Sequence, residues 1–335
     1  MHRFPLLFLL AVSVRSFWLN EMAHPVSLED AIIFVVVYLA CTSIDKRRFT
    51  AIIRLIPLVV LPPTIFFVSG RPWVPNPLAG VNQGAYVLGI VFLIQSILGF
   101  CSPSSNSLYR AFNFTLATFA LFLIWQTSSR AAILSCLFSL GLIWIMNSCS
   151  LKSYFLKITS LFMIPFSALL FKQYFLPSST GFPGIDMQSD LGRFRILKCY
   201  LSLPFSGDNQ FIYGVGFEKA KSLCLDPSGG GSFDHAHNLY VQVFANSGIL
   251  GFVMLLLFVG FLTSCWSQIN IVGATDNLLF LPLFGKAAFI YTLVQGFFDL
   301  SVIHWPITII LTAFIVSTPV AILASETSSH SNRAA

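Results

Sequence analysis

The chain has 335 residues, of which 56% are hydrophobic and only 10% charged, and its formal net charge is +6. A soluble domain carries about 25% charged residues, so this composition is that of a polytopic membrane protein. The basic residues are scattered over loops and form no patch interleaved with aromatic residues. The positive charge therefore gives no indication of a nucleic-acid partner, and membrane lipids are the expected surroundings.

Apolar runs long enough to cross a bilayer recur along the chain. They predict about ten transmembrane helices, near residues 4–19, 28–44, 51–68, 84–100, 111–127, 131–146, 158–176, 238–265, 278–298 and 305–324. The expected fold class is all-α, a polytopic transmembrane helical bundle that forms a single membrane domain over 1–335. The run Phe4–Val14 resembles the core of a signal peptide, but Arg15 interrupts it, so we expect a retained first span.

Lysine and arginine in the short loops set the expected orientation. Lys46–Arg48 follow the second expected span, Arg110 precedes the fifth, and Lys152 lies between the sixth and seventh. These positions all fall on the cytoplasmic side if the N- and C-termini are cytoplasmic too. The polar segment 177–237 is then one large extracytoplasmic loop between the seventh and eighth spans.

The cysteine, histidine and acidic residues of the sequence give little indication of metal or redox chemistry. The seven cysteines form no CxxC and no zinc-type spacing with histidine, and the external carboxylates are spread singly. We therefore expect neither a metal site nor a cofactor. Cys199 and Cys224 share the long polar loop, where they can pair if the loop faces an oxidising compartment and otherwise remain thiols.

Three arginines at the expected external edge are candidates for chemistry. Arg130 lies between two apolar spans, where an arginine usually faces a cavity or a partner. The alternative is an interfacial arginine that reaches lipid headgroups. Arg193 and Arg195 lie in an amphipathic stretch of the long loop, and guanidinium groups suit phosphate oxygens. The alternative there is a helix lying on the membrane surface.

A histidine pair directly precedes the eighth expected span, in the stretch HAHNLYVQVFANSGILGF from His235 to Phe252. At the boundary between water and lipid, His237 can accept a proton from a sugar hydroxyl. The alternative is a histidine that only caps the helix or completes a hydrogen bond. Gly248 and Gly251 are expected to let a neighbouring membrane helix approach closely.

The same stretch resembles the signature of the O-antigen ligase and polymerase superfamily of bacterial envelope glycosyltransferases. This signature has His, then Asn, Ser or Gln, nine residues, Gly, two residues, and Gly, Thr or Tyr. His237, Asn238, Gly248 and Gly251 occupy its four required positions.

Other segments are similar to this family as well, and the resemblance covers about Leu116–Leu262. Ser129-Arg130 resembles the family's Ser-Arg at the external end of a span. The sequence GVGF at Gly214–Phe217 resembles the GxGF that precedes the histidine, with an arginine upstream. Asn82 resembles an asparagine at the start of an earlier span. We therefore take 116–262 as the ligase- or polymerase-like core.

The resemblance implies metal-independent transfer of a glycan from an undecaprenyl-pyrophosphate carrier to a lipid- or protein-linked acceptor. The reaction would take place on the external face of the bacterial inner membrane. His237, Arg130 and Arg193 are the expected catalytic residues, because the histidine takes the acceptor proton and the arginines neutralise the leaving pyrophosphate. The expected substrate-binding residues are Arg195, Asn238, Ser129 and Asn82.

Three alternatives remain open. A repeat-unit polymerase of O-antigen or exopolysaccharide would use the same layout with a lipid-linked acceptor. A bicarbonate- or anion-type transporter would use Arg130 and His237 at a central site, although transporters place polar residues at the membrane midplane and here they gather at one edge. The third alternative is an inactive relative kept as an assembly partner, or an enzyme of reduced activity. Family members usually have about twelve spans, and this chain is expected to have about ten.

Overall fold

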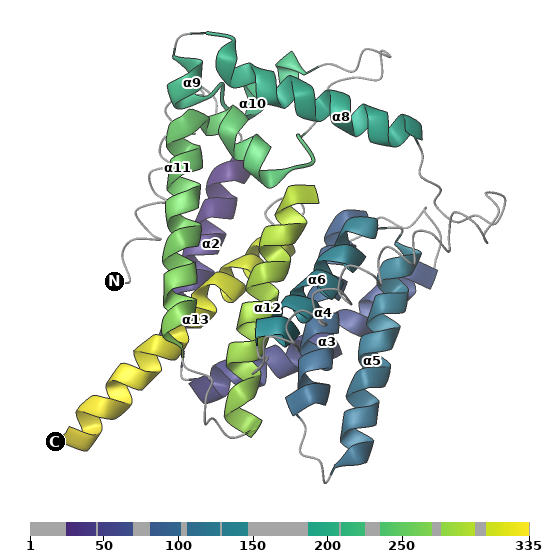
Figure 1. The fold of residues 1–335 in the computed structure, drawn as a ribbon, viewed down its shortest axis with the longest axis vertical. Coiled ribbons are helices and arrows are strands. Elements are labelled where there is room, and N and C mark those ends of the chain that lie inside the picture. The colour runs from purple at the N-terminus through teal and green to yellow at the C-terminus, as the bar shows by residue number, and fades with distance from the viewer. Residues whose placement is uncertain are drawn as a thin grey trace. The chain divides into compact units, whose positions relative to one another are not determined.

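The structure is a computed structural model. It describes residues 25–44, 46–69, 81–101, 106–127, 129–146, 187–207, 209–224, 235–269, 276–298 and 306–334. Its helices are α2 (Pro25–Ser43), α3 (Lys46–Ser69), α4 (Val81–Cys101), α5 (Ser107–Gln126), α6 (Arg130–Met146), α8 (Met187–Ser202), the 3₁₀ helix η1 (Leu203–Phe205), α9 (Gln210–Tyr213), α10 (Phe217–Leu223), α11 (Leu239–Gln268), α12 (Asp276–Phe298) and α13 (Pro306–Ala334) (Figure 1). Over the described residues there is no strand, and the predicted all-α fold is confirmed.

The expected membrane spans coincide with helices wherever the structure describes them. The spans expected at 4–19 and 158–176 lie outside the described residues. Within the described part of the chain, four helices, α4, α5, α11 and α12, are long and apolar enough to cross a membrane, and α2, α6 and α13 contain shorter apolar stretches. The protein is therefore a multi-pass membrane protein.

The chain divides into two compact units. Unit 1 contains Met1–Ala51, Ser189–Val272 and Gly296–Ala335, and unit 2 contains Ile52–Gln188 and Gly273–Gln295. Each unit combines segments that are far apart in the sequence. The expectation of a single membrane domain over 1–335 stays a prediction.

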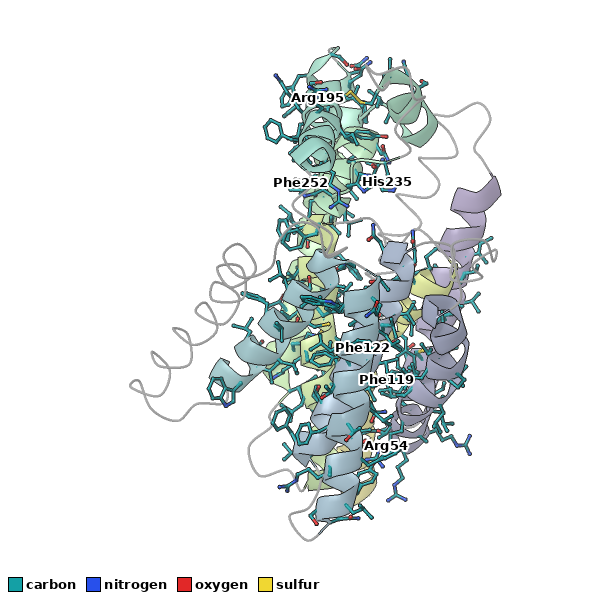
Figure 2. The ribbon with its side chains drawn as sticks, turned by 90° about the vertical axis from the view of Figure 1, so that its right-hand side faces the viewer. Arg54, Phe119, Phe122, Arg195, His235 and Phe252 are labelled. Carbon is teal, nitrogen blue, oxygen red and sulfur yellow. A yellow bond between two sulfur atoms is a disulfide. The ribbon has the colours of Figure 1, made fainter. Side chains whose placement is uncertain are left out.

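In unit 2, α4 forms the core. It is buried without interruption from Gly84 to Gly99, because it is apolar all round and both α5 and α6 pack against it. The Tyr86 ring stacks on Tyr291 of α12 with centroids 5.4 Å apart, and the hydroxyls of Tyr86 and Thr292 lie 2.9 Å apart. At the other end of α12, the Arg54 guanidinium of α3 lies 5.4 Å from the centre of the Phe280 ring, and Figure 2 labels Arg54.

In unit 1, α13 packs against α2 and also contacts α11. The rings of Phe49 and Phe314 stack with centroids 4.3 Å apart, which joins the start of α3 to α13. Helix α11 contacts α9, α10 and η1 in addition to α13. It therefore connects the helical core of unit 1 to the short helices of the long polar loop.

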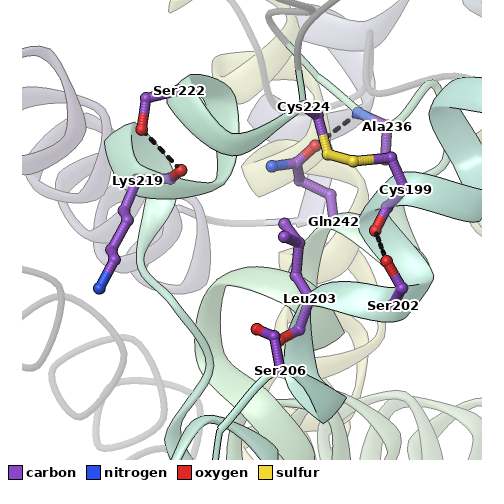
Figure 3. Close-up of a disulfide and its surroundings, with 9 residues drawn as sticks. All are labelled: Cys199, Ser202, Leu203, Ser206, Lys219, Ser222, Cys224, Ala236 and Gln242. Atoms are coloured by element: carbon purple, nitrogen blue, oxygen red, sulfur yellow. Dashed lines mark hydrogen bonds between the residues drawn. A yellow bond between two sulfur atoms is a disulfide. The ribbon is translucent and has the colours of Figure 1, made fainter.

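We call α8, η1, α9 and α10 together with residues 235–247 the loop subdomain. Residues from α8, η1, the GVGF segment, α10 and the segment 235–247 share one apolar core, made of Ile196, Tyr200, Leu203, Val215, Ala220, Cys224, Ala236 and Ala245. Cys199 and Cys224 form a disulfide, with Cα atoms 5.9 Å apart, that joins α8 to the end of α10 (Figure 3). Of the two possibilities that the sequence left open for this cysteine pair, the bonded one is found.

Candidate functional site at the start of helix α11

Helix α11 is two helical segments joined by a kink at Gly248. The backbone of Gly248 has φ 62° and ψ −163°, which is outside the helical region. Such a conformation is accessible to glycine and strained for other residues. The short segment 239–247 therefore belongs to the loop subdomain, and the apolar segment 249–268 continues as the span.

The GVGF segment lies along the short segment of α11. The Val215 amide donates to the Ala245 carbonyl over 2.9 Å, and the Gly216 amide donates to the Asn246 carbonyl over 3.0 Å. Gly214 has a φ of 70° at the start of this pairing. The GVGF segment and the histidine motif are thus in direct backbone contact, through pairs of residues 30 positions apart in the sequence.

This geometry corrects the expectation that Gly248 and Gly251 accommodate a neighbouring membrane helix. A Cβ on Gly248 would lie 2.5 Å from the carbonyl of Ile212 and 2.6 Å from the Gly214 nitrogen, so the close neighbour is the end of the short helix α9 in the same subdomain. A Cβ on Gly251 would collide with the Ser247 side chain on the other side of the kink. Both glycines are needed for the bend within α11 itself.

His237 has the most unusual backbone of the site. Its φ is +50°, and it is the only non-glycine residue with positive φ in the described part of the chain. The left-handed region costs an L-residue roughly 1–2 kcal/mol. Its amide donates to Nδ1 of His235 over 3.2 Å, and the two imidazole rings meet edge to face with centroids 4.1 Å apart. A strained residue at the predicted catalytic position is a frequent property of functional sites.

The residue before His237 is anchored by a buried side chain. The Ala236 amide donates to Oε1 of Gln242 over 2.7 Å, and Figure 3 draws this bond. Nε2 of Gln242 donates in turn to Oδ1 of Asn246 over 3.1 Å. Gln242 is only 3% exposed, and its bond to Ala236 is buried, whereas the bond to Asn246 is partly buried.

The residue after His237 joins two helices. Oδ1 of Asn238 accepts the Val241 amide over 3.0 Å and so caps the start of α11. Nδ2 of Asn238 donates over 2.8 Å to the carbonyl of Phe297, in the last turn of α12, where carbonyls lack helical partners. The Tyr240 ring also lies against the Phe297 ring, with centroids 4.3 Å apart. The substrate-binding role of Asn238 stays a prediction.

Arg193 and Arg195 are both exposed on α8, and Figure 2 labels Arg195. Two residues along a helix correspond to a rotation of roughly 200°, so the two guanidinium groups leave the helix on different sides. Arg193 lies seven residues before Tyr200 and shares its stripe, and Tyr200 packs in the core that contains Ala236. Arg193 is therefore on the same stripe of α8 as Tyr200, whose ring packs in the core of the loop subdomain.

The remaining predicted residues lie in unit 2. Arg130 is the first residue of α6, and Ser129 directly before it is buried, with an Oγ that has no hydrogen-bond partner among the described residues. Asn82 lies in the first turn of α4. Because short connections join α4 to α5 and α5 to α6, the helices α4 and α6 begin at the same end of unit 2 (Figure 1).

The structure thus gathers the predicted residues in two groups. His237, Asn238 and the two arginines of α8 belong to unit 1, and Asn82, Ser129 and Arg130 belong to unit 2. The meeting of both groups at one site stays a prediction. Among the described residues, no group of three or more histidine, cysteine or acidic side chains is placed to hold a metal ion.

Sequence reasoning missed Gln242 and Asn246. Both lie inside the nine unspecified residues of the histidine motif. Nothing in the sequence there distinguishes them from polar residues on the surface of an ordinary helix. One signal was available, because polar residues recur at positions 238, 242 and 246 and so follow one stripe of the helix.

These features define the class of the protein. It is a multi-pass α-helical membrane protein in which a strained histidine, held in a disulfide-bonded loop subdomain, directly precedes a span. Residues 114–256 match the model of a family described as O-antigen ligase. The match begins in α5, includes Ser129 and Arg130, and ends in α11 beyond the kink. This segment is therefore similar to the O-antigen ligase family, as the resemblance implied, and that family is one of membrane glycosyltransferases of the ligase and polymerase type. No curated protein matches the chain.

Proposed function

We propose that this protein is an O-antigen ligase-like glycosyltransferase that moves a glycan from an undecaprenyl-pyrophosphate carrier to an acceptor hydroxyl. The observation that carries the proposal is His237. It lies within the segment that matches the ligase family, it has a strained φ of +50°, and both flanking residues are hydrogen-bonded. An imidazole whose backbone is fixed by hydrogen bonds, at the start of a span, is suited to general-base catalysis at the membrane surface.

The disulfide supports an external site in the bacterial inner membrane. Cys199 and Cys224 lie in the loop subdomain, and disulfides persist in oxidising compartments such as the bacterial periplasm. The loop subdomain then lies on the outer face, which agrees with the positive residues in the opposite loops. The N- and C-termini are cytoplasmic in this orientation.

In the proposed reaction, the acceptor oxygen attacks the anomeric carbon, and His237 takes the hydroxyl proton. The bond from the anomeric carbon to the pyrophosphate oxygen breaks, and the anomeric centre is inverted. Arg130 and Arg193 neutralise the charge that develops on the leaving pyrophosphate, so the transfer needs no metal ion. Arg130 is the first residue of α6, and the N-terminus of a helix also favours the binding of anions.

The other predicted residues bind substrate in this proposal. Asn82 and Ser129 lie at the starts of α4 and α6, where a hydroxyl and an amide can hydrogen-bond polar groups of the donor. Arg195 binds the donor from a different side of α8 than Arg193. Asn238 acts beside His237. The acceptor is a lipid- or protein-linked hydroxyl.

Complementation of glycan display tests this function. A strain that lacks the protein receives the wild type, His237→Ala or Arg130→Ala, with Lys219→Ala as a matched control that removes an exposed cation of the loop subdomain. Insertion is checked by immunoblot, the envelope glycan is separated on a gel, and the lipid-linked pool is extracted. We expect both site variants to insert and to lose transfer, by about 100-fold or more for His237→Ala.

The lipid-linked pool separates the alternatives. Full-length polymer that accumulates on the lipid carrier identifies a ligase. Single repeat units that accumulate instead identify a polymerase of O-antigen or exopolysaccharide. An unchanged glycan in both site variants would overturn the transferase function, and uptake of bicarbonate or another anion would then be measured.

A further inference from the structure

We infer that Gln242 is a positioning residue for His237, an inference that rests on the proposed function of this histidine. Gln242 is the fourth residue of α11, five residues after His237, and its amide bonds the Ala236 backbone and the Asn246 side chain. Its side chain fixes the backbone that presents the imidazole. No motif position of the ligase family signature falls on it.

The first step of the argument is the bond to Ala236. This amide immediately precedes His237, and it donates to Oε1 of Gln242 over 2.7 Å in a buried place. A positive φ at His237 is maintained only when the peptides on both sides are held, because an L-residue otherwise relaxes to the extended or helical region. Asn238 holds the following side through its bond to Phe297, and Gln242 holds the preceding side.

The second step is the choice of a glutamine. A carboxamide has an acceptor and a donor on one side chain, and Gln242 uses both, one for Ala236 and the other for Asn246. The Asn246 carbonyl accepts the Gly216 amide over 3.0 Å. One chain of hydrogen bonds therefore runs from the residue before His237 to the GVGF segment, and Gln242 is its central member.

The third step of the argument is the effect of removing the Gln242 amide. An apolar side chain of the same length would leave the Ala236 amide buried without an acceptor, and buried polar groups without partners are strongly unfavourable. The loop 235–237 would then change its backbone to rehydrate this amide. A displacement of about 1 Å of a catalytic group can cost about 100-fold in rate.

The test compares Gln242→Met with Gln242→Glu. Methionine keeps the length and flexibility of the side chain and removes both hydrogen bonds. Glutamate keeps the oxygen that accepts from Ala236. Gln268→Met, at the exposed end of the same helix, is the matched control. The donor is the lipid-linked glycan pool extracted from the deletion strain, supplied to purified enzyme at varied concentration with membranes of that strain as acceptor.

We expect Gln242→Met to lower kcat by about 100-fold with the KM for the donor changed less than about twofold. Gln242→Glu should restore kcat to within about tenfold of the wild type, and Gln268→Met should match the wild type. The Cys199–Cys224 disulfide should form in every variant, which shows that the loop subdomain has folded. Hydrogen exchange should show faster exchange of the peptide that contains Ala236 in Gln242→Met alone.

The outcomes separate the inference from the proposed function. If His237→Ala is inactive while Gln242→Met has wild-type kcat and exchange, only the positioning role is overturned. If His237→Ala itself transfers glycan normally, the proposed function falls, and the exchange measurement still decides whether Gln242 holds the loop. A loss that Gln242→Glu shares in full, or a Gln242→Met protein that lacks the disulfide, would show a general folding role and overturn the inference.

Discussion

The backbones of Gly214 and Gly248 cross in direct contact. A Cβ on Gly248 would lie 2.6 Å from the Gly214 nitrogen, and a Cβ on Gly214 would collide with the peptide that joins Asn246 to Ser247. Both glycines also have positive φ, 70° and 62°. The contact fixes the kink of α11 and connects the GVGF segment to the short segment of α11 that follows His237.

Gly214→Ala and Gly248→Ala should each destabilise the protein, because the new methyl group meets backbone atoms that cannot move aside. Left-handed strain alone costs about 1–2 kcal/mol, and the collision adds to it. The expected result is a lower midpoint of thermal unfolding in detergent and a smaller yield of the Cys199–Cys224 disulfide. Gly260→Ala is the control, since nothing lies within 4 Å of a Cβ there. An unchanged midpoint for Gly248→Ala would contradict the crossing.

The Cys199–Cys224 disulfide should stabilise the loop subdomain. It joins residues 25 positions apart, and closing a loop of that size in the unfolded chain corresponds to about 3 kcal/mol. Cys199→Ser should lower the unfolding midpoint, and added reductant should lower that of the wild type but leave the variant unchanged. Cys101→Ser, outside the bridge, should respond to reductant as the wild type does. Thiol labelling of the unreduced wild type at both cysteines would refute the bond.

The positions of the spans and of the histidine motif were predictable from sequence, because both depend on local patterns. Apolar run length predicted where α4, α5 and α12 lie, and the polar-to-apolar boundary predicted a helix start at residue 238, one residue from the observed first residue of α11. Cys199 and Cys224 also lie within one loop, so the sequence showed that they could pair but did not decide whether they do.

The kink and the hydrogen-bond chain were not predictable in the same way. Gly248 in an apolar helix is compatible with both a helix contact and a bend, and only the position of Ile212 and Gly214 decides between them. Gln242 bonds backward to a loop residue and forward to Asn246, an arrangement that depends on the fold of the whole loop subdomain. Tertiary partners of this kind leave no periodic signal in the chain.

Asn238 should tolerate serine better than alanine. Serine keeps an oxygen that can cap α11, although it cannot reach the Phe297 carbonyl, whereas alanine loses both bonds. Loss of a cap costs about 1 kcal/mol, so Asn238→Ala should have the lower unfolding midpoint of the two. Circular dichroism during heating in detergent measures the difference. Equal midpoints would show that the cap contributes nothing.

Arg193→Ala should reduce glycan transfer more than Arg195→Ala. The two side chains leave α8 roughly 200° apart, and only Arg193 lies on the stripe of Tyr200, which packs in the same core as Ala236, the residue before His237. Loss of a charge-assisted bond to the leaving pyrophosphate should lower the rate by about tenfold for Arg193→Ala. Arg195→Ala should mainly raise the KM for the donor. Rates measured at varied donor concentration separate the two effects, and equal losses of kcat would contradict the assignment by helix face.

Gln295 and Thr292 lie less than one turn apart on α12 and should respond in opposite ways to apolar replacement. Gln295 is 0% exposed, and neither atom of its amide has a hydrogen-bond partner among the described residues. Thr292 bonds the Tyr86 hydroxyl at 2.9 Å and the Ala288 carbonyl at 2.8 Å. A buried polar group without partners costs about 1–3 kcal/mol, and a satisfied one contributes about 1 kcal/mol.

Gln295→Met should therefore raise the midpoint of thermal unfolding in detergent, and Thr292→Val, which keeps the shape of the side chain, should lower it. The double variant should lie between them, because the two side chains have separate partners and their effects should add. A lower midpoint for Gln295→Met would show that its amide is hydrogen-bonded in the folded protein. Such a result would require a polar group at this end of unit 2 within reach of the last turns of α12.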